Sequence, residues 1–370
     1  MKLESALHQP RAQAAASDLA PDVSFFEFWP GWAFYGPIAA YWVALGLRYG
    51  SFSLPTAANP NITLGGLCGE SKRSILDQVG AAQRGVLARY TGIITHASDA
   101  RADRIAVEAA IATAGFTYPM VAKPDIGCNG TGVRLVSDQA ELLRYLNAFP
   151  RNEGLLLQEF IHHDGEAGLF YVREPGERSG RLTSITLKYP PRVVGDGRST
   201  LRELILADPR AGRVPYLYLP RLTHRLHEIP ARGERVRLVF VGNHCKGSIF
   251  RNGIELATPA LTSRIDALAQ SMPEFHFGRV DVRFESTQAL ARGDGFRVIE
   301  INGAGSEATH VWDPATRLSD AWRAQFFHYG AAFRIGAANR ARGFRPARLT
   351  MMWRDWRRQK RLMAAYPMND

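Results

Sequence analysis

The sequence has little cysteine. Its three cysteines, Cys68, Cys128 and Cys245, stand far apart among 370 residues, and none belongs to a CxxC pair. A disulfide framework is therefore not expected, and a reducing, cytoplasmic setting is the default interpretation. The N-terminus is polar and alanine-rich and lacks a basic start followed by an apolar segment, so we expect no signal peptide. We interpret residues 1–20 as a disordered tail.

The sequence also lacks an unbroken apolar run in its most aromatic part, Ser24–Tyr49. Prolines and glycines interrupt this segment, and the apolar run after Pro37 is about half of the roughly 20 residues that a transmembrane helix requires. Two interpretations stay open. The segment is either a helix buried against the core, or a helix or hairpin at a membrane interface with its tryptophan and tyrosine side chains at headgroup level.

Acidic residues are fewer than basic residues. The chain has 46 lysines and arginines against 35 acidic residues, a net charge of +11. This favours anionic partners such as a nucleotide, an acidic substrate, nucleic acid or a membrane surface. No recognised nucleic-acid motif accompanies the charge, so we expect no nucleic-acid partner. The length is sufficient for more than one lobe.

The positive charge is densest near the C-terminus. Residues 342–361 contain eight basic side chains and one acid, Asp355. Apolar residues recur there at helical spacing, as Leu349, Met352, Trp353 and Trp356. Residues 341–370 are therefore predicted to form a basic amphipathic helix. Such a helix either binds a membrane surface or a partner, or it is a solvated helix with its apolar side on the body of the protein.

Glycine is concentrated in a loop between two expected strands. A short apolar strand carries Lys123, the loop runs from Asp125 to Gly132, and a second strand follows. No GK[ST] follows the glycines, which excludes a Walker A loop, and the second strand excludes a dinucleotide-binding fingerprint. A loop of this kind can bring backbone N–H groups to phosphates, with the lysine as a point charge. A mobile hairpin is the alternative.

Two strands are predicted within Gly278–Glu307. Because side chains alternate along a strand, Arg279 and Asp281 share one face of the first strand, and Glu300 and Asn302 share one face of the second. Asp281, Glu300 and Asn302 could then meet as hard oxygen ligands of the kind that Mg²⁺ prefers. Two edge strands with solvated polar faces are the alternative.

These features occur in a fixed order along the chain. The lysine strand and glycine loop precede Gln158–Ile161 with Gly165-Glu166, then Lys188, then Gly-Arg-Val-Asp-Val and Glu-Ile-Asn. The series resembles the ATP-grasp superfamily, and most closely its D-alanine–D-alanine ligase-like carboxylate–amine ligases. The stretch Lys188–Ile205 also resembles the cyanophycin synthetases that add amino acids. The resemblance covers roughly Gly69–Asp313.

The resemblance implies an α+β fold, the ATP-grasp fold, in which two α+β lobes clamp ATP behind a short aromatic-rich N-terminal segment. The expected division of the chain after the tail is as follows: residues 21–115 as the aromatic segment and pre-grasp domain, 116–185 as the small lobe with the glycine-rich loop, 186–340 as the large lobe with the metal site, and 341–370 as the basic helix.

The resemblance also implies roles for individual residues. Lys123 and, more loosely, Lys72 would contact phosphate, Lys188 would reach the transferred phosphate, and Arg279 would lie beside the reacting carboxyl. Asp281, Glu300 and Asn302 would hold Mg²⁺, with Mn²⁺ as a substitute. The remaining ATP contacts would be Gly127, Asn129, Gly130, Thr131 and Gly132 of the loop, the hinge residues Gln158, Glu159, Phe160 and Ile161, and Glu166.

The implied activity is that of an ATP- and Mg²⁺-dependent carboxylate–amine ligase, which forms a C–N bond through an acylphosphate and acts on a small-molecule carboxylate and amine. The sequence departs from the family in two places that shape the substrate pocket. The segment before Lys72 is short, and the loop after Asn302 lacks a proline often found there. Ser306, Glu307 and His310 of that loop are candidate substrate contacts, with a plain turn as the alternative.

Other interpretations stay open at this point. The chain could instead be a non-catalytic nucleotide-binding protein associated with an anionic membrane surface through Trp29–Tyr49 and the basic C-terminal helix. Peripheral membrane contact is also compatible with the ligase interpretation, as is a homodimer.

Overall fold

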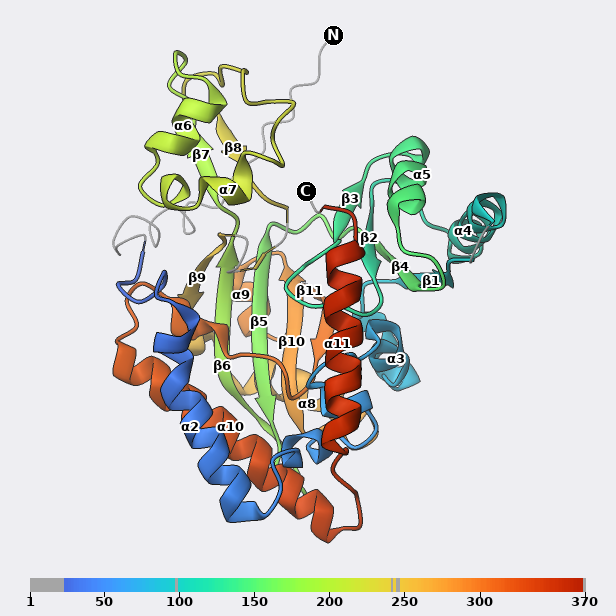
Figure 1. Cartoon of the computed structure of the whole chain (residues 1–370), viewed down its shortest axis with the longest axis vertical. Coiled ribbons are helices and arrows are strands. Elements are labelled where there is room, and N and C mark those ends of the chain that lie inside the picture. Colours follow the sequence, from blue (N-terminus) through green and yellow to red (C-terminus); the bar gives the residue numbers. More distant parts are fainter. Residues whose placement is uncertain (1–22, 97–98, 241, 244–246, 369–370) are drawn as a thin grey trace.

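The structure is a computed structural model that describes residues 23–96, 99–240, 242–243 and 247–368. The tail predicted at residues 1–20 and Cys245 lie outside these residues. The described residues form three sheets flanked by helices, and all strand pairs in the sheets are antiparallel (Figure 1). The α+β class predicted from the sequence is therefore confirmed.

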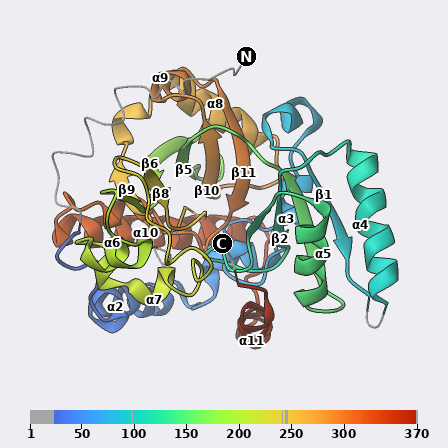
Figure 2. The same ribbon diagram turned by 90° about the horizontal axis from the view of Figure 1, so that it is seen from above.

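A four-stranded sheet and two helices form the smaller lobe. The strand order is β1 (Tyr90–Ile94), β4 (Gly154–Glu159), β2 (Met120–Pro124) and β3 (Arg134–Val136). The helices α4 (Ala100–Ala114) and α5 (Gln139–Ala148) lie on the same side of this sheet (Figure 2). Met120 and Ala122 of β2 pack against these helices. Because side chains alternate, Val121 and Lys123 point to the other face, where they line a pocket.

A five-stranded sheet forms the larger lobe. Its order is β11 (Phe296–Asn302), β10 (Phe277–Phe284), β5 (Gly165–Val172), β6 (Arg181–Tyr189) and β9 (Ile249–Asn252), with α9 (Thr287–Ala291) between β10 and β11 in the chain. The register sets Arg279 opposite Asn302 and Asp281 opposite Glu300. The alternative of two solvated edge strands is wrong for β10, because β5 pairs with its other side.

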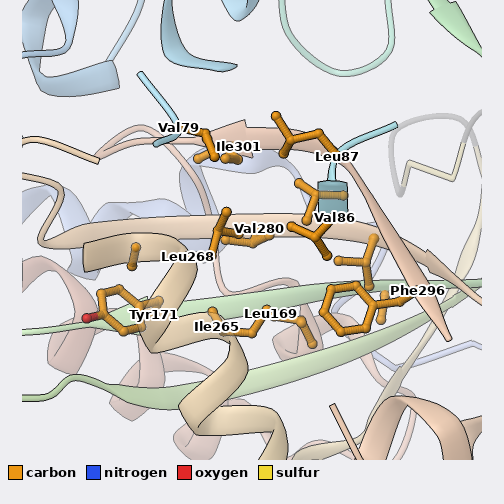
Figure 3. Packing of buried hydrophobic residues seen from close by; sticks show 14 of the residues in the cluster. Val79, Val86, Leu87, Leu169, Tyr171, Ile265, Leu268, Val280, Phe296 and Ile301 are labelled. Carbon is orange, nitrogen blue, oxygen red and sulfur yellow. The ribbon is translucent and has the colours of Figure 1, made fainter. Parts of the chain in front are cut away.

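Helices cover both faces of the five-stranded sheet. On one face, Ile265 and Leu268 of α8 (Pro259–Gln270) pack in one cluster with Leu169 and Val280 of the sheet (Figure 3). On the other face, a second cluster joins α10 (Leu318–Ala341) to the sheet through Ala331, Ile335, Phe170 and Phe277. The apolar residues of β10 at even positions are thus buried in the first cluster, and the charged residues at odd positions face the side of α10 and the pocket.

The aromatic N-terminal segment forms α2 (Gly31–Tyr49), which runs alongside α10 (Figure 1). Phe34 and Ile38 of α2 are buried, whereas Trp32 is 79% and Leu47 70% exposed. The interpretation of a helix packed on the core therefore holds for one face of α2, and the other face is exposed. Contact of this helix with a membrane interface stays a prediction. None of the helices in the described ranges has the length and apolarity needed to cross a membrane.

A small two-stranded unit follows β6. It contains β7 (Arg192–Val194), α6 (Leu201–Ala207), α7 (Pro215–Tyr218) and β8 (Arg235–Arg237), which enclose their own buried cluster. Arg210 of this unit forms a buried ion pair with Glu27 of the N-terminal segment. This ion pair fastens the unit to the start of the described chain.

The strands of the two lobes come from other parts of the chain than the predicted lobe boundaries imply. The small lobe was expected at residues 116–185, but β5 and most of β6, which lie in that range, belong to the five-stranded sheet. Conversely, β1 lies in the predicted pre-grasp range 21–115 and pairs with β4 of the small sheet. The physical reason is that strand pairing is a long-range contact, so an apolar strand can fit either sheet until its partners are known.

The C-terminal helix α11 (Leu349–Ala365) stands out from the body and reaches from the larger lobe to the smaller one (Figures 1 and 2). The backbone N–H of Gly69 donates a hydrogen bond to Gln359 of α11. Just beyond the helix, the Tyr366 hydroxyl donates to the carbonyl oxygen of Ile126 at 2.7 Å. The predicted helix is therefore present, and it is anchored next to the glycine-rich loop.

Candidate active site

A pocket of about 410 Å³ lies between the two lobes. Nearly all of the predicted site residues line it: Lys72, Lys123, Gly127, Asn129, Gly130, Thr131, Gln158, Glu159, Phe160, Ile161, Glu166, Lys188, Arg279, Asp281, Glu300, Asn302, Ser306 and Glu307. The two that are not part of the lining are Gly132 and His310. Residues from distant parts of the chain thus converge on one place, because β2 and β4 of the small lobe face β10 and β11 of the large lobe.

Asp281 is the buried centre of the charged groups in this pocket. Its carboxylate accepts hydrogen bonds from Arg279 Nε at 2.9 Å, Arg279 Nη2 at 3.0 Å and Lys188 Nζ at 3.0 Å. Asn302 Nδ2 donates to it as well, at 3.2 Å. Burial raises the pKa of Asp281, but the charges and hydrogen bonds of Arg279 and Lys188 outweigh burial and hold the pKa below its usual range. The group is therefore an anion that two cations neutralise.

Lys123 lies on β2 with its ammonium group enclosed. It donates to Gln158 Oε1 at 2.9 Å and to the carbonyl oxygen of Ile299 at 3.0 Å. That carbonyl is accessible because the β10–β11 register shifts beside Asp281. Burial lowers the pKa of Lys123 to about 8, with Glu300 acting in the opposite direction. Both acceptors of Lys123 are uncharged oxygens, so they do not neutralise its ammonium group. Its positive charge can therefore attract an incoming anion.

The short helix α3 (Lys72–Asp77) begins at the same pocket. Ser71 is its N-cap, and the Ser71 side chain accepts a hydrogen bond from the N–H of Ser74. Lys72 Nζ donates to the carbonyl oxygen of Gly127 at 2.6 Å and lies 3.8 Å from Glu300 Oε1. Lys72 therefore bridges the glycine-rich loop and the carboxylate of β11.

The glycine-rich loop has the backbone conformation that glycine permits. Gly130 and Gly132 have φ values of +65° and +75°, and Asn129 also has a positive φ, of +56°. A Cβ at Gly132 would lie 2.7 Å from Pro124 Cγ and 3.0 Å from Tyr366 Cβ. Gly132 thus packs closely against Pro124 and Tyr366 rather than against the pocket, which explains why it is not part of the lining.

The predicted hinge follows β4. Glu159 lines the pocket but also forms an ion pair with Arg89 at 2.8 Å. Phe160 lies under Arg283, whose guanidinium carbon is 5.3 Å from the ring centroid. Arg283 stands on the same face of β10 as Arg279 and Asp281, as the alternation predicts. Its contact with the hinge could not be predicted from the sequence, because it depends on how the two lobes meet.

Lys188 joins Asp281 to a second carboxylate. Its Nζ lies 3.2 Å from Glu166 Oε1, since β5 and β6 place Glu166 directly opposite Lys188. Gly168, two residues after Glu166, leaves the space for this network: a Cβ there would lie 2.9 Å from Arg279 Cδ and 3.0 Å from Asp281 Oδ1. An isolated glycine within an apolar strand was the sequence signal for this close approach.

The loop after β11 brings Glu307, but not His310, to the pocket. The Glu307 carboxylate accepts hydrogen bonds from the Tyr35 hydroxyl at 3.0 Å, Trp312 Nε1 at 2.9 Å and Gln325 Nε2 at 2.6 Å. Ser306 lines the pocket and donates its hydroxyl to the Gly303 carbonyl at 2.6 Å. All of these partners of Glu307 are uncharged.

The prediction of His310 as a pocket residue is not supported. His310 lies in a 3₁₀ turn, Thr309–Trp312, whose first and last residues line the pocket. In such a turn side chains three apart share a side, so His310 points elsewhere. Burial lowers its pKa, which makes it a neutral side chain beside the site.

Several pocket residues that carry polar groups were not predicted from the sequence, among them Tyr35, Trp312 and Glu70. Tyr35 comes from α2 and Trp312 from the turn before α10, and no sequence signal links two residues that far apart. Glu70, directly before α3, lines the pocket, and its Oε2 has no hydrogen-bond partner among the described residues. Burial raises the pKa of Glu70, opposed by Lys72. The position of an acidic residue directly after a glycine-rich turn could have indicated Glu70 as a pocket residue.

The residues predicted to hold Mg²⁺ are suited to that ion in their chemistry. Two carboxylates and one amide oxygen from neighbouring strands line the same pocket, and hard oxygen donors are what Mg²⁺ prefers. Asp281 already forms ion pairs with Arg279 and Lys188. The oxygen atoms of Glu300 and Asn302 are therefore the ones with fewer competing charged partners. Within the described part of the chain, no three histidine, cysteine or acidic residues gather as a metal-binding group.

Comparison with known proteins found similar solved structures at low sequence identity. No family profile and no curated relative matches the sequence. Among solved structures, the chain is similar to a D-alanine–D-alanine ligase from Bacillus anthracis, with 15% identity, a TM-score of 0.41, and coverage of 76% of this chain and 71% of the other.

Two further structures are similar to the chain. For the VanG D-Ala:D-Ser ligase from Enterococcus faecalis, identity is 13%, the TM-score 0.40, and coverage 72% of this chain and 64% of the other. For a bifunctional glutathione synthetase from Pasteurella multocida, identity is 16%, the TM-score 0.35, and coverage 69% of this chain and 35% of the other. The chain therefore spans less than two thirds of each of these two proteins.

Proposed function

We propose that this chain is an ATP- and Mg²⁺-dependent carboxylate–amine ligase that works through an acylphosphate. One observation carries the proposal: Lys123, Lys188 and Arg279 converge with Asp281, Glu300 and Asn302 on a single pocket beneath a glycine-rich loop. Cations, the backbone amides of a glycine-rich loop and hard oxygen donors for Mg²⁺ are groups that bind a polyphosphate.

In the first step of the proposed reaction, a carboxylate oxygen attacks the γ-phosphate of ATP, and ADP leaves. The negative charge on the phosphate oxygens needs positive groups at fixed positions. Lys123 and Lys72 reach the pocket from the small lobe and Lys188 from the large lobe. The residues Asp281, Glu300 and Asn302 would hold Mg²⁺, which when bound supplies further positive charge to phosphate.

In the second step an amine attacks the acyl carbon, and phosphate leaves. Arg279 is held in place by Asp281 and by a hydrogen bond from its Nη1 to the Glu307 carbonyl at 3.0 Å. We assign to Arg279 the stabilisation of the oxyanion that forms on the acyl group. We assign to Glu307 and Glu70, two carboxylates of the pocket, the binding of the ammonium form of the amine. The ammonium group gives up one proton to a carboxylate before its nitrogen attacks the acyl carbon.

The test is a screen of the purified protein with ATP, Mg²⁺ and pairs drawn from a panel of amino acids and amines. The proposal predicts ADP and phosphate release that requires both a carboxylate and an amine, and a product that contains both. Absence of ATP binding in excess Mg²⁺ would refute it. ATP binding without turnover against the whole panel would instead favour the non-catalytic nucleotide-binding alternative.

A further inference from the structure

The exposed side of α11 carries apolar residues that the fold does not use. Leu349 is 56%, Trp353 59% and Trp356 46% exposed. Their spacing of i, i+4 and i+7 places them in one row along the helix. The sequence alternative in which the apolar side of this helix packs on the body is therefore wrong for these three residues, and a row of exposed large apolar side chains needs an explanation.

The opposite side of α11 explains why this row faces outward. Leu362 is buried, and Gln359 accepts the hydrogen bond from Gly69. At the end of the helix, Tyr366 stacks on Phe149 with ring centroids 5.3 Å apart. These contacts fix the rotation of the helix about its axis, so Trp353 cannot turn inward without breaking them.

A basic row borders the apolar row. Arg354, Arg357 and Arg361 follow one another at i, i+3 and i+7 and are exposed. Two cations also lie over the tryptophan rings: Arg357 is 4.7 Å from the Trp353 centroid, and Lys360 is 4.5 Å from that of Trp356. The exposed face thus combines apolar side chains with positive charge.

We propose that the outer face of α11, defined by Leu349, Trp353, Trp356 and the flanking basic side chains, docks the protein on an anionic lipid bilayer surface. Tryptophan and leucine insert at the boundary between headgroups and acyl chains, while arginine and lysine contact anionic headgroups. A second copy of this chain does not suit the face, because two such basic rows would repel each other. Nucleic acid would use the basic row but leaves the apolar row without a partner.

The test uses the full chain and vesicles of two compositions, phosphatidylcholine alone and phosphatidylcholine mixed with phosphatidylglycerol. We expect the wild type to sediment with the mixed vesicles, to release as salt rises, and to bind phosphatidylcholine at least tenfold more weakly. The double variant Trp353→Ala/Trp356→Ala and the double variant Arg357→Glu/Arg361→Glu should each weaken binding to the mixed vesicles at least tenfold. Unchanged melting curves would show that both variants fold.

A matched control separates α11 from the other exposed aromatic segment. Trp32→Ala on α2 removes a tryptophan that is even more exposed, and binding should change less than twofold. Loss of binding in Trp32→Ala but not in the α11 variants would overturn the proposal, as would equal binding to both vesicle types. Binding to a single-stranded RNA oligonucleotide without binding to the vesicles would overturn it in favour of nucleic acid.

Discussion

Among single residues, Asp281 is the centre of a network of charged side chains in the pocket. It is a buried carboxylate whose two cationic partners approach from different strands, Arg279 from β10 and Lys188 from β6. A buried charge is tolerated only when it is paired, so the three side chains form one unit. Each of the two cations retains further donors for substrate, and Arg279 is the one nearer to the loop that carries Glu307.

The variant Arg279→Ala tests the role of this arginine. Lys188 still neutralises Asp281, so ATP affinity should change less than threefold, whereas turnover should fall by about 100-fold because an oxyanion donor is lost. Equilibrium ATP binding and steady-state turnover measure the two effects. Arg279→Lys, which keeps the charge, should recover part of the turnover. Parallel loss of ATP binding and turnover would make Arg279 a structural residue instead.

The pKa of Lys123 leads to a prediction about pH. Its pKa of about 8 means that the free lysine loses its proton above that pH. Bound phosphate favours the protonated form, so ATP affinity should be constant below pH 8 and fall by about tenfold per pH unit above it. Calorimetry between pH 7 and 9.5 measures this slope. Lys123→Met should bind more weakly and lose this slope, and a slope that persists in Lys123→Met would assign it to another group.

Because side chains alternate along a strand, the face on which each polar residue of a strand lies could be predicted from the sequence. Arg279, Asp281, Glu300 and Asn302 were expected on shared faces, and the register of β10 and β11 places them so. Tyr35 could not be foreseen, because its hydrogen bond to Glu307 joins positions 272 apart in the chain. Such a contact depends on α2 packing beside α10, and aromatic packing of this kind leaves no periodic signal.

At the scale of elements, the glycine-rich loop is held between α3 and the segment after α11. The carbonyl of Gly127 accepts from Lys72, and that of Ile126 accepts from Tyr366. The loop is therefore connected to α3 on one side and to the C-terminal segment on the other. The strands that flank it could be predicted, but its contact with the C-terminal segment could not.

The variant Gly132→Ala tests how closely the loop is confined. Its added methyl group would meet Pro124 and Tyr366 in a backbone conformation with φ of +75°, so we expect a loss of about 1–3 kcal/mol in the free energy of unfolding and at least tenfold weaker ATP binding. Gly176→Ala is the matched control, since its φ is +94° and no atom lies within 4 Å. Thermal melting and ATP binding distinguish the two variants. Equal effects on ATP binding would contradict the assignment of the loop to phosphate.

At the scale of the whole molecule, the N-terminal segment and the unit of β7 and β8 are joined through one buried ion pair. Arg210 donates to both carboxylate oxygens of Glu27, and also to the carbonyl oxygens of Gly247 and Ser248. This link could not be predicted from the sequence, since neither residue lies in a motif. It ties the start of α2 to a unit that otherwise has its own core.

The variant Glu27→Gln should therefore destabilise the protein strongly. It removes the carboxylate charge that pairs with the buried Arg210 guanidinium, and we expect a loss of about 3–5 kcal/mol in the free energy of unfolding. Denaturant titration measures the effect. Arg181→Gln, which breaks an exposed ion pair with Glu177, should change this free energy by less than about 0.5 kcal/mol. Similar small losses in both variants would show that the Glu27–Arg210 pair is not a structural link.

The central claim is that the pocket between the lobes activates a carboxylate with ATP. Hydroxylamine traps an acylphosphate as a hydroxamate, so the most direct measurement is hydroxamate formation from a panel of carboxylates in the presence of ATP and Mg²⁺. We predict hydroxamate in a one-to-one ratio with ADP for at least one carboxylate, and a reduction of at least 100-fold in Glu300→Gln. ATP that binds tightly but yields neither ADP nor hydroxamate with any carboxylate would contradict the claim.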